Sequence, residues 1–187
     1  MSLAKRRLFF SLMFRMFPAG RLMCIKRRIL RLCGVEIGRD CQVYPGVSFW
    51  GAGRIVIEDG VVIRGDVRIE SNGIVRIGAQ SELNHLTYIA ANGDSSVIIG
   101  DHTRIAHFVS IKTTTHAIAP TGICIAGEDD YKDIKIGSGA WICAGAIILP
   151  GVEIANKSIV AAGAVVTRSL GRGLLAGCPA VIKKCYD

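Results

Sequence analysis

A single histidine, His116, is the residue best suited to do chemistry in this sequence. It follows three threonines in the stretch SIKTTTHAIAP, residues 110–120. A neutral imidazole can take a proton from a hydroxyl near pH 7, so His116 is a candidate general base, the alternative being a loop histidine bonded to a backbone carbonyl. One of the acids Glu128, Asp129 and Asp130 could orient its ring, although a solvated loop explains them equally well.

The elements that must position this histidine are set by a repeat of six residues. One aliphatic residue recurs at every sixth position from Ile136 to Val166, and the same phase appears earlier in three groups of three. Insertions separate these groups, and the longest follows Ile111 and contains His116. The repeat consists of Ile57, Ile63, Ile69, Ile77, Leu83, Ile89, Ile99, Ile105, Ile111, Ile136, Ile142, Ile148, Ile154, Val160 and Val166.

A period of six fits neither an amphipathic helix nor a simple alternating strand. It predicts short flat strands joined by tight corners, with three hexapeptides in each triangular coil and the aliphatic side chains pointing to the axis. Stacked coils then bury one continuous apolar column. Coincidental Ile- and Val-rich strands in a sandwich would not keep this phase. We therefore predict an all-β repeat domain over residues 34–170, with an inserted loop at 112–135 and a C-terminal tail at 171–187.

Two stretches resemble the hexapeptide-repeat acyltransferases. They are IGDHTRIAHFVSIKTTTH (residues 99–116) and the segment from IGSGAWICAGAIILPGVEI to GLLAGCPAVIKK (residues 136–184). The resemblance is to the sugar O-acetyltransferase branch, which includes maltose and galactoside acetyltransferases and enzymes that acetylate surface polysaccharides. It implies a left-handed parallel β-helix, an exception to the right-handed crossover rule. It also implies a homotrimer with active sites between subunits, acetyl-CoA as donor and no metal.

The same resemblance assigns roles to individual residues. It implies that His116, which ends the Thr-Thr-Thr-His motif, takes the proton of an attacking sugar hydroxyl. Asn84, with His85 beside it, resembles the asparagine that holds the acceptor, and a corner-forming asparagine is the alternative. For the coenzyme, the resemblance implies that Ala144 and Ala162 are small residues lining its groove and that Thr167 and Arg168 lie near its nucleotide end. It also implies that Lys183 and Lys184 are the cations that bind phosphate. Ordinary coil packing is the alternative for these six.

A second β-helix family, the gamma-class carbonic anhydrases, also carries two histidines five residues apart, together with a third from an earlier coil. His102 and His107 have that spacing, and His85 could supply the third ligand. Their phase relative to Ile99 and Ile105 differs by one residue from that family, however, and such a shift aims a side chain elsewhere. The seven cysteines are scattered without a C-x-x-C pair, which favours free thiols in a reducing cytoplasm.

The net charge of +8 is concentrated in residues 1–33, which hold nine basic side chains and no acid. Two helical pieces divided by the segment FPAG (17–20) are expected there, and the second has an apolar face of Leu22, Ile25, Ile29 and Leu32. This basic leader could rest on an anionic membrane at the cytoplasmic side, or it could cap the repeat domain or a neighbouring subunit. A non-catalytic scaffold is a further alternative, whereas no nucleic-acid-binding module is recognisable.

Overall fold

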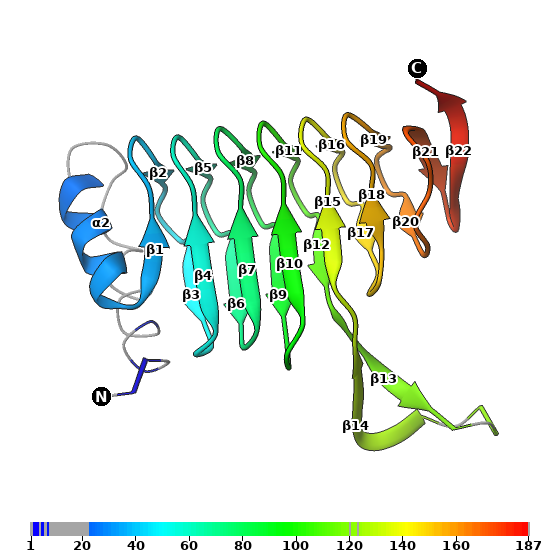
Figure 1. Cartoon of the computed structure of the whole chain (residues 1–187), viewed down its shortest axis with the longest axis horizontal. Coiled ribbons are helices and arrows are strands. Elements are labelled where there is room, and N and C mark those ends of the chain that lie inside the picture. The colour runs from blue at the N-terminus through cyan, green and yellow to red at the C-terminus, as the bar shows by residue number, and fades with distance from the viewer. Residues whose placement is uncertain are drawn as a thin grey trace.

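The computed structural model describes residues 2, 3, 5, 7, 23–119, 121–122 and 124–186, with 124–127 described by their backbone alone. The expected first helical piece and the FPAG segment lie outside the residues described, apart from isolated positions. Most of the chain forms a parallel β-solenoid of six coils, with the helix α2 (Met23–Leu32) at its N-terminal end (Figure 1).

Each coil contributes one short strand to each of three parallel sheets. The first sheet contains β1 (Val35–Ile37), β4 (Arg54–Ile57), β7 (Ile74–Ile77), β10 (Ser96–Ile99), β15 (Ile134–Ile136) and β18 (Glu153–Ile154). The second contains β2 (Gln42–Val43), β5 (Val62–Ile63), β8 (Glu82–Leu83), β11 (Arg104–Ile105), β16 (Trp141–Ile142) and β19 (Ile159–Val160). The third contains β3 (Ser48–Trp50), β6 (Arg68–Ser71), β9 (Tyr88–Ala91), β12 (Ser110–Lys112), β17 (Ile147–Ile148) and β20 (Val165–Val166).

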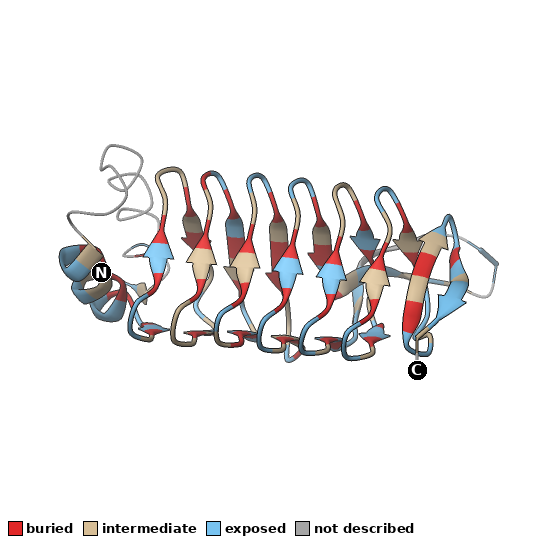
Figure 2. Ribbon diagram, turned by 90° about the horizontal axis from the view of Figure 1, so that it is seen from above, coloured by how far each residue is buried: buried red, intermediate tan, exposed pale blue. Residues whose placement is uncertain are grey.

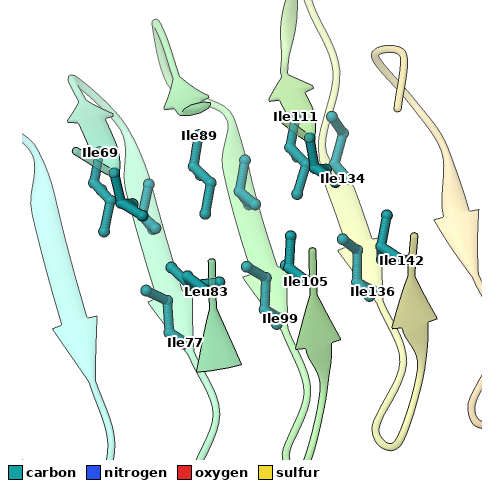
Figure 3. Packing of buried hydrophobic residues seen from close by; sticks show 14 of the residues in the cluster. Ile69, Ile77, Leu83, Ile89, Ile99, Ile105, Ile111, Ile134, Ile136 and Ile142 are labelled. Atoms are coloured by element: carbon teal, nitrogen blue, oxygen red, sulfur yellow. The ribbon is translucent and has the colours of Figure 1, made fainter. Parts of the chain in front are cut away.

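The aliphatic column predicted from the six-residue period forms the core. All fifteen repeat positions are buried, and buried residues recur along the strands of every coil (Figure 2). The strand register stacks equivalent residues directly, as in Leu83, Ile105 and Ile142 on successive coils (Figure 3). Because each stacked pair removes both side chains from water, the hydrophobic effect stabilises every coil through its neighbours. The predicted three-sided solenoid is thus confirmed.

Helix α2 closes the N-terminal end of the column by packing on β1 and β2. The apolar face predicted for this helix was wrong at Ile25 and Leu32, whereas Ile29 is partly buried against the core and Leu22 lies outside the described residues. Ile25 and Leu32 are 51% and 66% exposed, whereas Leu30 and Lys26 are buried. The Lys26 amine donates to the Val43 carbonyl at 3.1 Å, so a lysine replaces the expected aliphatic residue on the inner face. Burial lowers the pKa of this amine.

A second buried cation binds the backbone at the same end. The guanidinium of Arg7 donates to the carbonyls of Cys33 (3.1 Å), Gly34 (3.0 Å), Gly51 (3.1 Å) and Gly53 (2.9 Å). Two of the leader's basic side chains therefore satisfy carbonyl groups that the solenoid would otherwise leave unpaired. The leader thus caps the repeat domain through Arg7 and Lys26. Contact between the exposed face of α2 and a membrane stays a prediction.

The other end of the solenoid is finished by two longer strands, β21 (Gly173–Gly177) and β22 (Ala180–Cys185). β21 pairs in parallel with β19, and β22 then returns antiparallel beside it, so the expected tail extends the second sheet. No helix among the residues described is long and apolar enough to span a bilayer.

Candidate functional site

The insertion that contains His116 forms an antiparallel hairpin. Its strands are β13 (Thr114–Ile118) and β14 (Cys124–Tyr131), and it projects from the corner between the third and first sheets (Figure 1). We call this corner the hairpin edge; it comprises residues 91–95, 113–119, 121–122, 124–133, 149–152 and 167–171. In the hairpin register His116 lies opposite Asp129. The two side chains that the sequence offered as a base and a possible partner are therefore neighbours across two strands.

His116, Asp129 and Tyr131 form a hydrogen-bonded chain. His116 Nδ1 lies 2.9 Å from Asp129 Oδ1, and the Tyr131 hydroxyl donates to Asp129 Oδ2 at 3.2 Å. Partial burial and then the adjacent carboxylate raise the pKa of Tyr131, which keeps its phenol protonated as a donor. A proton on Nδ1 facing the carboxylate leaves the Nε2 lone pair free. This is the arrangement that a general base requires.

The base of the hairpin is fixed to the solenoid by buried contacts. Thr113 is fully buried, and its hydroxyl accepts hydrogen bonds from the Asn92 amide (3.0 Å) and the Ser95 hydroxyl (2.7 Å). A Cβ placed on Gly93 would come within 2.9 Å of the Tyr131 ring, so Tyr131 lies directly on the backbone of the preceding turn. These contacts fix where β13 and β14 leave the solenoid.

A hollow of about 850 Å³ opens on the hairpin beside His116. The imidazole is 68% exposed, so a substrate can reach it from solvent. The hollow is open to solvent, and all of its lining residues belong to the two hairpin strands. Its lining residues are Thr115, His116, Ala117, Ile118, Glu128, Asp129, Asp130 and Tyr131.

A different corner, between the second and third sheets, carries half of the other residues predicted to bind substrates, namely Asn84, His85, Ala144 and Ala162. We call it the alanine edge, after Ala144 and Ala162. His85, His107, Ala144 and Ala162 occupy equivalent positions on successive coils there. Backbone hydrogen bonds join these positions: the Phe108 amide donates to the His85 carbonyl at 3.1 Å, the Gly145 amide to the His107 carbonyl at 3.0 Å and the Gly163 amide to the Ala144 carbonyl at 2.9 Å. The small Ala144 and Ala162 side chains leave this backbone ladder accessible.

Asn84 lies at the start of the same corner, and its side chain makes a structural hydrogen bond within the solenoid. Its side-chain amide donates to the Ile105 carbonyl of the next coil at 3.3 Å. This contact supports the corner-forming alternative for Asn84 while leaving its carbonyl oxygen outside that bond. His85 beside it is exposed.

The remaining predicted coenzyme contacts lie elsewhere. Thr167 and Arg168 follow β20 on the hairpin edge, two coils beyond the hairpin, and both are exposed. Lys183 and Lys184 lie on β22, exposed, at the end of the strand remote from the alanine edge. One chain therefore does not bring all the predicted residues together, but distributes them over two edges and the C-terminal hairpin.

The histidines and cysteines near these edges do not suggest other chemistry. His102 lies on the corner between the first and second sheets, one strand away from His107, so the two do not converge within a chain. Over the described ranges, no three metal-ligating side chains form a group that could hold an ion. Burial raises the pKa of the Cys143 thiol beside Ala144, which disfavours a thiolate nucleophile there.

Sequence reasoning did not single out three exposed side chains near these edges. Trp141 is exposed on β16, in the strand that leads to Ala144, and Leu86 and Phe108 are exposed on the alanine edge itself. Trp141 was visible as an aromatic in the outward phase of the repeat. Leu86 and Phe108 were detectable only as apolar residues at corner positions.

Comparison with known proteins agrees with this architecture. Residues 133–168 match the model of the bacterial transferase hexapeptide (six repeats). This match spans the two coils from β15 to β20. A hexapeptide-repeat acetyltransferase from Vibrio cholerae O1 biovar eltor, solved as a complex with acetyl-CoA, has the same fold with a TM-score of 0.72 at 21% identity, covering 99% of this chain and 88% of that one.

Two curated relatives are named acetyltransferases. The galactoside O-acetyltransferase of Lactococcus lactis is 33% identical over 92 residues, which are 49% of this chain and 44% of that protein. A putative colanic acid biosynthesis acetyltransferase of Escherichia coli K12 is 24% identical over 155 residues, or 82% of this chain and 71% of that one. The chain thus matches less than half the length of the first of these relatives and about seven tenths of the second.

Proposed function

We propose that this chain is an acetyl-CoA-dependent O-acetyltransferase that modifies a hydroxyl of a sugar. The observation that carries the proposal is the His116–Asp129 pair, 2.9 Å apart on an accessible hairpin that interrupts a hexapeptide-repeat solenoid. The relatives named above support the acetyl donor and the sugar acceptor. The colanic acid enzyme favours an acceptor in surface polysaccharide or lipid-linked glycan synthesis.

His116 acts as the general base. Its Nε2 takes the proton of the acceptor hydroxyl while the hydroxyl oxygen bonds to the acetyl carbonyl carbon. The carbon–sulfur bond then breaks, and the imidazolium returns the proton to the departing thiolate. Asp129 holds the ring in the required orientation and stabilises its positive charge, and Tyr131 holds Asp129.

The donor fits the alanine edge. Ala144 and Ala162 leave room for a pantetheine arm against backbone hydrogen-bonding groups, and the exposed Trp141 indole adds an apolar wall. Arg168, Lys183 and Lys184 are the exposed cations suited to phosphate. Acetyl-CoA supplies the activated acyl group, and this chain positions it.

The distribution of these residues over two edges supports a homotrimer. The hairpin of one subunit would lie against the alanine edge of the next, which makes three equivalent sites by cyclic symmetry. A monomer would have a base and a donor groove on different corners.

The main test is a CoA-release assay with acetyl-CoA and a panel of sugar acceptors. We expect turnover by the wild-type chain and a loss of about 10²- to 10⁴-fold in His116→Ala, the usual contribution of general-base assistance. An alanine variant with full activity would exclude His116 as the base.

Mixed trimers test the location of the site. His116→Ala removes the base and Ala162→Trp obstructs the donor groove, so each variant should be inactive alone. Co-assembled in equal amounts, they should recover about a quarter of wild-type activity, because one site in four then combines an intact hairpin with an intact edge. No recovery in verified mixed trimers would place the site within one subunit.

The exposed face of α2 suggests peripheral contact with an anionic membrane at the cytoplasmic side. Ile25 and Leu32 are exposed there beside basic residues such as Arg28. Exchanging both for serine should abolish sedimentation with phosphatidylserine vesicles and leave the buried cap intact. Unchanged sedimentation would refute this contact.

A further inference from the structure

Two apolar residues on the alanine edge occupy a backbone conformation that disfavours them. Leu86 and Phe108 have φ angles of 59° and 61°, in the left-handed region. The other described non-glycine residues with positive φ are polar or charged: Asp40, Asp66, Gln80, His102 and Lys157. A bulky apolar side chain gains nothing from this conformation, whereas glycine, asparagine and aspartate adopt it readily.

These two side chains are also exposed to water. Leu86 is 51% exposed and Phe108 is 59% exposed. They occupy the same corner position on successive coils, and the Phe108 amide donates to the carbonyl of His85 at 3.1 Å. At that corner position, the next two coils carry glycine, Gly145 and Gly163. Both residues thus combine an unfavourable backbone with an unfavourable exposure, at adjacent levels of one edge.

Polar groups flank this apolar pair on both coils. His85 precedes Leu86 and His107 precedes Phe108, and the rings of His107 and Phe108 meet edge to face, with centroids 5.3 Å apart. Asn84 lies at the start of the same turn. This part of the edge therefore presents two exposed apolar side chains next to two exposed imidazole groups and the side chain of Asn84.

We propose that Leu86 and Phe108 form a platform for the acceptor and determine its specificity. A pyranose ring has one face of C–H groups and a rim of hydroxyls, which matches an aromatic and aliphatic centre bordered by His85 and His107. This inference rests on the proposed function. It adds that the acceptor site of each subunit pair lies on the alanine edge, on the two coils that precede those of Ala144 and Ala162, facing the hairpin of the neighbour.

Asparagine substitutions separate this role from a structural one. Asparagine suits the left-handed backbone, so Phe108→Asn and Leu86→Asn should keep or raise the thermal unfolding midpoint. We expect the KM for the sugar acceptor to rise about tenfold or more in each, with the KM for acetyl-CoA unchanged. Lys157→Asn is the matched control, because Lys157 is an exposed residue with the same left-handed backbone on another corner; it should change neither constant.

Direct binding gives a second reading that does not need turnover. Saturation-transfer NMR with the same sugars should show contacts to ring C–H protons in the wild type that weaken in Phe108→Asn. Equal acceptor KM values and equal NMR contacts in variant and wild type would overturn the platform. Loss of the trimer in Phe108→Asn, measured by sedimentation, would overturn it in favour of a subunit contact. If the wild type binds sugars but releases no CoA, the proposed function fails while the platform stands.

Discussion

The coils of the solenoid and the hairpin that interrupts them are stabilised by different interactions. In a coil, each inward side chain meets an equivalent aliphatic residue above and below, so contacts such as Leu83 on Ile105 recur along the molecule. In the hairpin, each side chain has a particular partner, as His116 has Asp129. The coils are buried and repetitive, whereas the hairpin is exposed and specific.

This difference separates stability from chemistry. The column can keep its shape whatever the hairpin carries, because coil contacts involve only neighbouring coils. The hairpin in turn can present exposed polar groups that a coil could not bury without cost. Changes in the two regions should therefore affect different measurements.

The largest effect is expected from a change in the column. Ile105→Ala leaves a cavity between Leu83 and Ile142, with which Ile105 is stacked, and should lower the free energy of unfolding by about 2–5 kcal/mol. Denaturant unfolding followed by circular dichroism measures this. Ile147→Ala is the control, since Ile147 is an isoleucine of the same solenoid with its side chain exposed, and it should cost about 1 kcal/mol or less. Equal losses would contradict a continuous buried column.

A change in the hairpin should leave stability intact and reduce the rate. Asp129→Asn keeps the size of the side chain but removes the charge that faces the imidazolium, so we expect kcat to fall by roughly 100-fold with little change in acceptor KM. The unfolding transition should match that of the wild type. Steady-state kinetics and denaturant unfolding on the same preparation measure both quantities.

Two further variants calibrate that loss. Asp130→Asn changes the neighbouring acid, which pairs with Lys132 at 2.9 Å, and should leave kcat near wild type. Tyr131→Phe removes one neutral hydrogen bond to Asp129 and should lower kcat only about fivefold. A large effect of Asp130→Asn would mean that acidity in general, and not the bond from Asp129, supports the reaction.

The same contrast explains what could be predicted from the sequence. From Ile57 onward the column was predictable residue by residue, because a fixed period of six specifies which side chains meet. His116 was identifiable from its motif and its place after Ile111. The sequence offered three acids as partners for it, and only the antiparallel register of the hairpin selects Asp129. An insertion without periodicity carries no signal for that register.

The capping helix shows a second limit of pattern reading. Apolar spacing selected Ile25 and Leu32 as the inner face, yet Lys26 and Leu30 are buried there. A lysine has a long aliphatic stem, and here its amine finds the Val43 carbonyl at the end of the solenoid. Pattern reading treats every lysine as polar and so cannot anticipate an acceptor supplied by an unpaired backbone group.

Both ends of the solenoid are closed. The Arg7 guanidinium occupies the carbonyl groups at the first coil, and at the last coil β22 runs against the direction of the other strands with two lysines exposed along it. The first and the last coil are therefore each covered by another part of the chain. Open strand ends favour pairing between molecules, and here two buried cations of the leader, Arg7 and Lys26, cover the carbonyl groups at the first coil.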